Sequence, residues 1–331
     1  MKLSELGEFG LIEKLRNSFR VRSDRVQIGI GDDAAVLKLT STESLLATAD
    51  MLIEGVHFDL AFTDFYSLGW KSAAVNLSDI AAMGGNPRFC LTSLGISPAI
   101  TVEQISDFYR GCKAVLRRSG VVLVGGDTCL SPKAFVISIT LLGETVRKTK
   151  LLRSGARPGD RIFVTGTLGD AAAGLELLRT GRAPDDRSGR KLTAKHLRPE
   201  PRIAWGRVIA RAGAAHAMID VSDGLSSDLI HLSEESGVGA VVNADAIPVS
   251  RQLCRLSGSL SLSPLTYALD GGEDYELLFT APPGKLASLR SLGIELHEIG
   301  LITKSRSCFI VEGNGTRKKL KPGGYDHFRK T

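Results

Sequence analysis

Short apolar runs that end in aspartate recur along this chain, and they constrain its fold more than any other feature. The aspartates are Asp32 and Asp33 in "GIGDDAAV", Asp50 in "ATADM", Asp127 in "VGGDT", and Asp220 and Asp223 in "IDVSDG". Any one of them could stabilise a turn or cap a helix by accepting backbone N–H bonds. Two carboxylates about 4 Å apart repel by roughly 4 kcal/mol at an effective dielectric near 20, so a shared site must bind protons or cations.

A further carboxylate stands on a mostly apolar helix. Residues 65–85, "FYSLGWKSAAVNLSDIAAMGG", predict this helix, and the spacings of Ser72, Asn76 and Asp79 place all three on one face. A buried carboxylate costs several kcal/mol unless something pairs with it. Asp79 therefore either lies on a solvated face or belongs to a polar site.

The acidic turns favour a particular kind of ligand. Oxygen-only ligand sets prefer Mg²⁺, Mn²⁺ or Ca²⁺ over zinc or copper. The sequence contains no G-x-x-x-x-G-K-[ST] loop and no protein-kinase catalytic loop. An ATP site in this chain would therefore depend on metal ions and loop backbone. Our hypothesis is that the acidic turns converge on a polyphosphate and its metal ions.

The chain is long enough for two domains. Its 331 residues exceed the size at which one hydrophobic core usually keeps growing. In "RKTKLLRSGARPGD", residues 147–160, apolar periodicity fades and Gly, Pro and basic residues take over, as at a domain junction. We therefore expect domains at 1–146 and 147–331. Strands alternate with helices in both, which predicts an α/β fold whose sheets are mixed.

Three local signals predict individual elements. Apolar residues at spacings of three and four predict an amphipathic helix over 4–19. Thr101 and Gln104 form a capping box and Gly120 follows the last turn, which predicts a helix over 102–119. The pair Asn314-Gly315 predicts the turn of a C-terminal hairpin.

Composition narrows the function classes. The net charge of +6 suits anionic partners, either nucleic acid or small anions. The basic residues are scattered apart from "TRKKLK" at 316–321, so a nucleic-acid-binding module is only the alternative reading. Five widely spaced cysteines without a C-x-x-C pair argue against a disulfide framework or a zinc site. No apolar run predicts a membrane helix or signal peptide, so we expect a cytoplasmic protein without a membrane partner.

The acidic motifs, taken with others in order, closely resemble the thiamine-monophosphate kinase family. The matching stretches are "GEFGLIEKL", "GIGDDAAVL", "NLSDIAAMGGNP", "GGDT", "LLRSGARPGD", "TGTLGDAAAGL", "DVSDGLSSDL", "GGEDYELLFT" and "GYDHF". The family shares a superfamily with aminoimidazole ribonucleotide synthetase, selenophosphate synthetase and a hydrogenase-maturation dehydratase. The resemblance implies an N-terminal domain that dimerises through its sheet, a C-terminal α/β domain, and ATP held between them with several Mg²⁺ ions.

The resemblance also implies roles for individual residues. The implied metal ligands are Asp33, Thr48, Asp50, Asp79, Asp127, Asp220 and Asp223. The implied ATP contacts are Tyr109, Gly126, Asp127, Arg153 and Ser222. The implied contacts to thiamine monophosphate are His57, Glu273 and Tyr325. One departure is Ala49, where relatives often carry a hydroxyl, so one metal contact beside Asp50 is missing or made by backbone.

Several of these residues have ordinary structural explanations as well. Tyr109 could pack on its helix, Arg153 could pair with a nearby carboxylate, and His57 could be a plain loop histidine. Tyr325 could lie on a frayed surface tail. In "GGEDYELLFT" the resemblance lets Glu273 face the cationic rings of thiamine, whereas Asp274 and Glu276 are expected to serve the surrounding structure.

The implied reaction is phosphoryl transfer from ATP to thiamine monophosphate. The acceptor phosphate oxygen is anionic at neutral pH, so we expect no general base, and charge stabilisation by Arg153 and metal ions instead. Two alternatives stay within the superfamily. A selenophosphate synthetase should carry a reactive cysteine and a lysine near the N-terminus, but the first cysteine is Cys90. A ribonucleotide synthetase would lack the "GYDHF" pattern.

Overall fold

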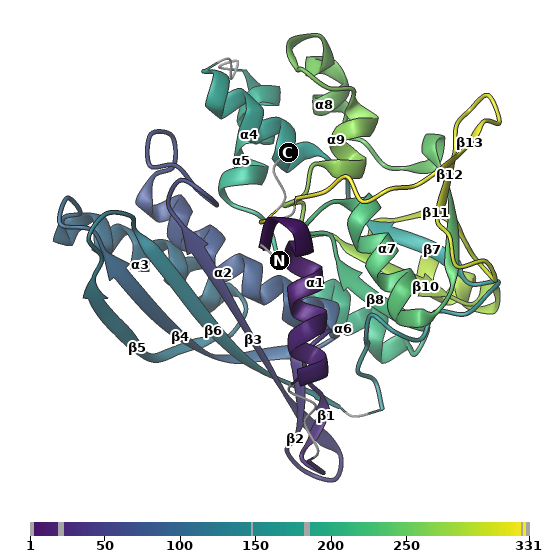
Figure 1. Cartoon of the computed structure of the whole chain (residues 1–331), viewed down its shortest axis with the longest axis horizontal. Coiled ribbons are helices and arrows are strands. Elements are labelled where there is room, and N and C mark those ends of the chain that lie inside the picture. Colours follow the sequence, from purple (N-terminus) through teal and green to yellow (C-terminus); the bar gives the residue numbers. More distant parts are fainter. Residues whose placement is uncertain (1–2, 19–22, 147, 182–185, 326, 329–331) are drawn as a thin grey trace.

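Two mixed β-sheets, one in each half of the chain, organise the molecule (Figure 1). The computed structural model describes residues 3–18, 23–146, 148–181, 186–325 and 327–328. The prediction of an α/β fold with two mixed sheets is confirmed. No helix within these described ranges combines the length and apolar character that a bilayer crossing requires.

The first sheet belongs to the N-terminal half. It comprises β1 (Val26–Ile28), β2 (Ala35–Lys38), β3 (Glu43–Ile53), β4 (Asn86–Ile96), β5 (Val122–Leu130) and β6 (Val136–Val146). The strand order is β1-β2-β3-β6-β4-β5, and only β4 and β5 run parallel. The helices of this half are α1 (Leu3–Ser18), α2 (Phe65–Ala82) and α3 (Val102–Arg118).

The second sheet belongs to the C-terminal half. It comprises β7 (Arg161–Thr165), β8 (Ala217–Asp220), β9 (Gly239–Asn243), β10 (Leu277–Ala281), β11 (Leu296–Thr303), β12 (Phe309–Val311) and β13 (Arg317–Lys319). The strand order is β13-β12-β9-β11-β7-β10-β8, with β12 parallel to β9 and the other neighbours antiparallel.

Short and medium helices surround this second sheet. The α-helices are α4 (Asp170–Thr180), α5 (Arg187–Leu197), α6 (Ile203–Ala212), α7 (Leu225–Ser236), α8 (Arg251–Leu256), α9 (Pro264–Asp270) and α10 (Leu286–Arg290). The 3₁₀ turns are η1 (Ala244–Ala246), η2 (Ser257–Ser259) and η3 (Pro283–Lys285).

Local sequence signals correctly predict several elements. Helix α1 corresponds to the helix predicted over 4–19, although residue 19 lies outside the described residues. Helix α3 begins after Thr101, and both hydrogen bonds of the predicted Thr101–Gln104 capping box are present. Strands β12 and β13 form an antiparallel hairpin around Gly315, which has a φ of 81°.

Two strands extend further than the sequence predicts. The acidic motifs suggest strands that stop at Asp50 and Asp127, but β3 continues to Ile53 and β5 to Leu130. Strand β3 pairs with β6 residue by residue from Glu43 to Ile53, so this continuous ladder satisfies the backbone beyond Asp50. Both carboxylates therefore project from strands rather than from turns.

One hydrophobic core crosses the expected domain junction. Leu77 and Ile139 from the first half share a buried cluster with Ile209 and Phe279 from the second. Helix α2 touches both α6 and β8. The boundary at 146/147 remains a prediction, but the two halves are joined by extensive apolar packing, which fixes the site between them.

Helix α2 also packs very closely against α3. A Cβ atom on Gly69 would lie 1.9 Å from the carbonyl oxygen of Phe108, and one on Gly111 would lie 1.9 Å from that of Tyr66. Only glycine lets the two backbones approach this closely. This contact fixes the position of α2, the helix that carries Asp79.

We expect Gly111→Ala to destabilise the protein by about 3 kcal/mol, because the added methyl group meets a backbone carbonyl that cannot move without shifting α2. The higher helix propensity of alanine offsets only about 1 kcal/mol of this loss. The matched control is Gly258→Ala, where nothing lies within 4 Å of the added Cβ. Urea unfolding of both variants measures the difference, and equal midpoints would contradict the tight helix crossing.

Candidate active site

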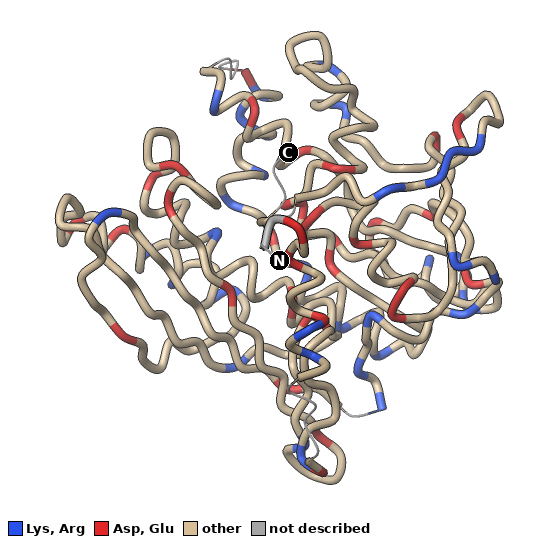
Figure 2. Tube along the Cα trace, viewed as in Figure 1, with Lys and Arg blue, Asp and Glu red and all other residues tan. Residues whose placement is uncertain are grey.

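A cavity of about 830 Å³ lies between the two halves of the chain. Its walls include α1, the loop before β2, strand β3, helix α2, the turn after β8, the segment before β10 and the C-terminal tail. Acidic segments gather at the centre of Figure 2, where the halves meet. The cavity therefore collects residues that are far apart in the sequence.

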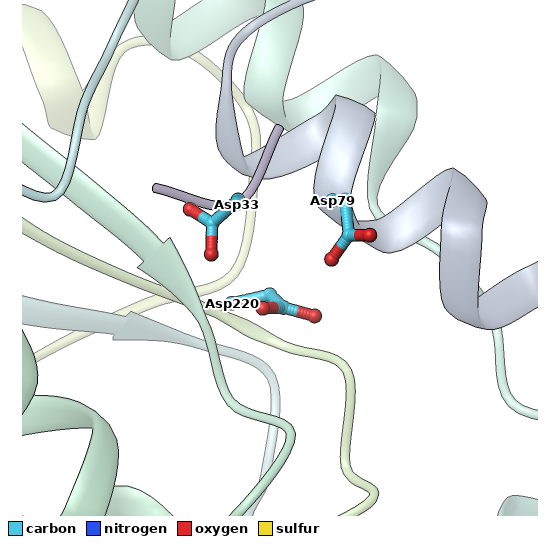
Figure 3. Close-up of side chains that lie close together, drawn as sticks. All are labelled: Asp33, Asp79 and Asp220. Carbon is cyan, nitrogen blue, oxygen red and sulfur yellow. The ribbon is translucent and has the colours of Figure 1, made fainter. Parts of the chain in front are cut away.

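Three buried or half-buried carboxylates form the centre of this cavity. Each of Asp33, Asp79 and Asp220 offers an oxygen, and these oxygens lie within 4.8 Å of one another. In Figure 3, Asp33 comes from a loop, Asp79 from a helix and Asp220 from the end of a strand, and their oxygens point into a common space. The predicted convergence of acidic motifs is thus present for these three residues.

The hydrogen bonds around the three carboxylates hold their orientation. Thr48 donates its hydroxyl to Asp79, and Ser78 donates its hydroxyl to Asp220 at 2.6 Å. Asp33 accepts from Nε and Nη2 of Arg153 through its Oδ1 atom at 2.9 and 2.6 Å. Arg153 therefore pairs with a nearby carboxylate, which is the structural role that the sequence allowed for it besides ATP binding.

One oxygen of this cluster has no hydrogen-bond partner among the residues that the structure describes. Asp33 Oδ2 is buried without a hydrogen bond. A buried carboxylate oxygen without a donor is costly, and a divalent cation would satisfy it. Three carboxylates with hydroxyl support are also the hard oxygen donors that Mg²⁺ prefers. The donor set therefore fits such a cation.

The electrostatics of the cluster support the same conclusion. Burial raises the pKa of Asp50 to about 6. Burial first, and the charge of Asp33 second, raise the pKa of Asp220 to about 7. Burial and three neighbouring carboxylates raise the pKa of Asp79 well above its usual value. Without a cation, these groups would take up protons near neutral pH.

The turn after β8 brings two further predicted residues to the cavity. Ser222 and Asp223 both line it. Asp228, which the sequence did not single out, accepts the backbone N–H groups of Ser222, Asp223 and Gly224 at 3.1 to 3.2 Å. Helix α7 begins after Gly224 without a side-chain cap, so Asp223 is not the cap of this helix.

The predicted polar face of α2 is only partly right. Asp79 lines the cavity, but so do Lys71 and Val75, which lie eight and four residues before it. Ser72 and Asn76 are buried elsewhere, and each bonds to a backbone carbonyl of the same helix. The side of α2 that faces the cavity is therefore the one that carries Lys71, Val75 and Asp79, which follow one another at intervals of four residues.

The residues predicted to contact thiamine monophosphate lie at the same cavity. His57, Glu273 and Tyr325 all line it. Nδ1 of His57 accepts the backbone N–H of Ile53 at 3.0 Å. The ring of His327 lies 4.8 Å from the rings of both His57 and Tyr325. His327 stands within the "GYDHF" motif but is not among the residues predicted from the sequence.

The two other acids of "GGEDYELLFT" serve the surrounding structure, as predicted. Asp274 accepts the backbone N–H groups of Gly169 and Ala171 at 2.6 and 3.3 Å, at the start of α4. Glu276 is fully buried, accepts the hydroxyl of Thr165 at 2.7 Å and pairs with Arg202.

Known proteins resemble this chain over nearly its whole length. Residues 31–145 match the AIR synthase related protein N-terminal domain, and residues 157–312 match the C-terminal domain of the same description. The thiamine-monophosphate kinase of Aquifex aeolicus is 38% identical, over 99% of this chain and 100% of that protein. The chain belongs to the thiamine-monophosphate kinase family. The member from Bacillus subtilis is 35% identical over 98% of this chain and 100% of its own length.

A solved structure of a family member has the same fold as this chain. The solved structure of AaThiL complexed with AMPPCP and TMP superimposes with a TM-score of 0.88, at 38% identity and 99% coverage of both chains. The predictions of the family, of the mixed-sheet fold and of a thiamine-phosphate kinase enzyme are therefore confirmed. The roles of individual residues remain predictions.

Three residues with predicted ATP roles lie outside the cavity of the single chain. Tyr109 on α3 packs against the core. Gly126 and Asp127 lie on β5, an edge strand on which every residue is exposed. The Asp127 side chain accepts only the backbone N–H of Thr128 among the hydrogen bonds found in the described residues. In one chain, therefore, Asp127 does not join the Asp33, Asp79 and Asp220 cluster.

Proposed function

We propose that this protein transfers the γ-phosphoryl group of ATP to the phosphate of thiamine monophosphate, giving thiamine diphosphate and ADP. The observation that carries the proposal is the convergence of Asp33, Asp79 and Asp220 in one cavity between the two halves. The relatives' name and the bound AMPPCP and TMP of the AaThiL structure support the choice of substrates.

The chemistry requires little of the protein beyond alignment and charge. In the transfer, the bond from the γ-phosphorus to the bridging oxygen of ADP breaks, and a bond to an acceptor phosphate oxygen forms. That oxygen is already anionic at neutral pH, so no side chain has to remove a proton. Two anions must instead be brought together against their repulsion.

Named residues supply this charge balance. Asp33, Asp79 and Asp220, with Thr48, Asp50 and Asp223 nearby, would hold Mg²⁺ ions. Bound there, Mg²⁺ supplies positive charge to the phosphate oxygens. Arg153 lines the same cavity and adds a fixed guanidinium. The hydroxyl of Thr48 and the hydroxyl of Ser78 keep two of the carboxylates oriented.

The nucleotide end is proposed to include a second copy of the chain. Strand β5 is an edge strand whose residues Val122, Leu123, Val124 and Leu130 are all exposed. A long apolar edge of this kind invites pairing with another strand. A homodimer formed along β5 would enclose Gly126 and Asp127, which do not line the cavity of the single chain.

A cytoplasmic location of the protein, expected from the sequence, likewise stays a prediction.

We expect Val124→Asp to convert the dimer to a monomer, because a charge placed in the middle of the apolar edge would be buried without a partner. Light scattering coupled to size exclusion measures the mass of both proteins. The control is Asp107→Asn on the exposed face of α3, which should leave the mass unchanged. A monomeric wild-type protein would rule out the dimer.

The proposed reaction is tested by incubating purified protein with ATP, Mg²⁺ and thiamine monophosphate and measuring thiamine diphosphate and ADP. Equal amounts of both products are expected. ADP formation with a different phosphate acceptor only would correct the substrate. A protein that never forms ADP would refute phosphoryl transfer.

A further inference from the structure

Lys71 is a fully buried cation on a helix made mostly of apolar residues. Its side chain is 2% exposed, and it lines the cavity from α2. A buried ammonium group costs several kcal/mol unless a partner balances it. The partner is Glu273, whose Oε1 lies 2.6 Å from Nζ. The proposed phosphoryl transfer assigns no role to Lys71.

Glu273 is held from a second side as well. Nδ1 of His196, on α5, lies 2.9 Å from Oε2, and the histidine is 3% exposed. The side chain of Glu273 is 28% exposed and lines the cavity. The three residues come from three separate elements, and Lys71 reaches across from the other half of the chain. The carboxylate therefore lines the ligand space while Lys71 and His196 contact it from two other elements.

The contacts of Lys71 and His196 with Glu273 depend on charge more than on hydrogen-bond geometry. Nζ of Lys71 and Nδ1 of His196 lie at ion-pair distance but without the angles of a well-formed hydrogen bond. Burial raises the pKa of Glu273, but the charge of Lys71 and the contact with His196 lower it by more than burial raises it. The pKa of Glu273 therefore lies below its usual range. Glu273 therefore stays ionised while its charge is balanced.

The backbone at Glu273 is in an unusual conformation. Its φ is 58° and that of Tyr275 is 50°, in the left-handed region that non-glycine residues rarely adopt. Backbone hydrogen bonds to Ser222 and Val221 fix this segment, at 2.7 and 2.9 Å. Such conformations persist where the surroundings determine them, and they concentrate at ligand sites.

We propose that Lys71 and His196 are positioning residues that fix the Glu273 carboxylate at the thiamine end of the cavity and so determine the affinity for thiamine monophosphate. The inference rests on the proposed function. It changes the expected role of Glu273, because a carboxylate paired with Lys71 contributes a directed hydrogen-bond acceptor more than a net negative charge facing the thiamine rings.

Lys71→Met keeps the volume of the side chain and removes its charge. We expect the KM for thiamine monophosphate to rise roughly tenfold or more, the loss that follows when a charged hydrogen-bonding group loses its fixed position. The KM for ATP and the kcat at saturation should change less than about twofold, because the aspartate cluster is untouched. Steady-state kinetics with each substrate varied separately gives both constants.

His196 allows a conservative rescue. His196→Asn keeps a polar N–H group near the position of Nδ1, where it can face the Glu273 carboxylate, whereas His196→Leu leaves only apolar atoms there. We expect the leucine variant to raise the KM for thiamine monophosphate and the asparagine variant to restore most of the wild-type value. A purely structural role of the imidazole would make the two variants alike.

The variants must be shown to fold. Lys71→Met leaves the partly buried carboxylate of Glu273 without its cation. The double variant Lys71→Met with Glu273→Gln should therefore recover thermal stability but not the low KM. The matched control is Lys195→Met, which removes a cation 3.4 Å from the buried carboxylate of Glu276. This control should leave the KM for thiamine monophosphate unchanged.

Two results would overturn the inference. One is a wild-type KM for thiamine monophosphate in both Lys71→Met and His196→Leu, and the other is an equal rise in the KM of both substrates. An inactive wild-type protein would instead refute the proposed function. Calorimetric titration with thiamine monophosphate would then still test whether Lys71→Met weakens binding.

Discussion

Asp79→Asn is expected to lower kcat by about a thousandfold while the chain still folds. Asp79 belongs to the carboxylate cluster, with an oxygen within 4.8 Å of oxygens from Asp33 and Asp220. Its replacement removes one of the proposed anionic ligands and with it the charge that a divalent cation would need there. A thousandfold loss corresponds to about 4 kcal/mol of transition-state stabilisation, the size that metal-assisted charge neutralisation provides.

The same substitution should not lower the stability of the metal-free protein. Asp79 is repelled by Asp50, Asp220 and Asp33, so a neutral side chain removes unfavourable charge. The amide oxygen of asparagine can still accept the hydroxyl of Thr48, which bonds to Asp79 in the wild type. Steady-state kinetics and thermal melts in EDTA give the two quantities. Near-normal turnover, or a loss of activity that merely follows unfolding, would count against the proposed site.

Elements that depend on neighbouring residues are the ones that the sequence predicts well. The Thr101–Gln104 capping box and the Asn314-Gly315 turn are local arrangements, and both lie where expected. Strand ends are predicted less well, because β3 is extended by its pairing with β6, which is far away in the sequence. Propensity cannot report such a partner.

The candidate site shows the same division between local and long-range information. The residue types predict a metal site made of oxygen ligands, but only the packing of the two halves brings Asp220 beside Asp33 and Asp79. Asp127 has the same local pattern and lies elsewhere, because β5 is at the outer edge of the first sheet. A motif therefore identifies a candidate ligand without stating which site it joins.

Lys71 shows why some site residues escape sequence analysis. A lysine on a helix usually extends to solvent, so "GWKSAAV" gives no reason to consider it buried. The available signal is periodicity, since Lys71, Val75 and Asp79 stand at intervals of four and all line the cavity. Asp228 escapes for a different reason, because its role is to bind the backbone of a turn several residues earlier.

Stabilisation of the protein by Mg²⁺ is expected to grow steeply as the pH rises from about 5 to 8. Burial raises the pKa of Asp50 to about 6 and that of Asp220 to about 7. A carboxyl group whose pKa is raised by folding contributes stability below its unfolded pKa, near 4, and loses that contribution as pH rises through its folded pKa. The metal-free protein therefore loses the contributions of these two groups between about pH 4 and 7.

A bound cation reverses this loss, because it replaces the protons that the carboxylates would otherwise take up. The quantity to measure is the difference in melting temperature with Mg²⁺ and with EDTA at each pH. Histidines whose pKa is lowered by burial, such as His231, change stability in the opposite direction, but they do so in both conditions and cancel in the difference. The difference should be small at pH 5 and several degrees at pH 8, and Asp79→Asn should remove most of it. A difference that does not vary with pH would mean that Mg²⁺ does not bind these carboxylates.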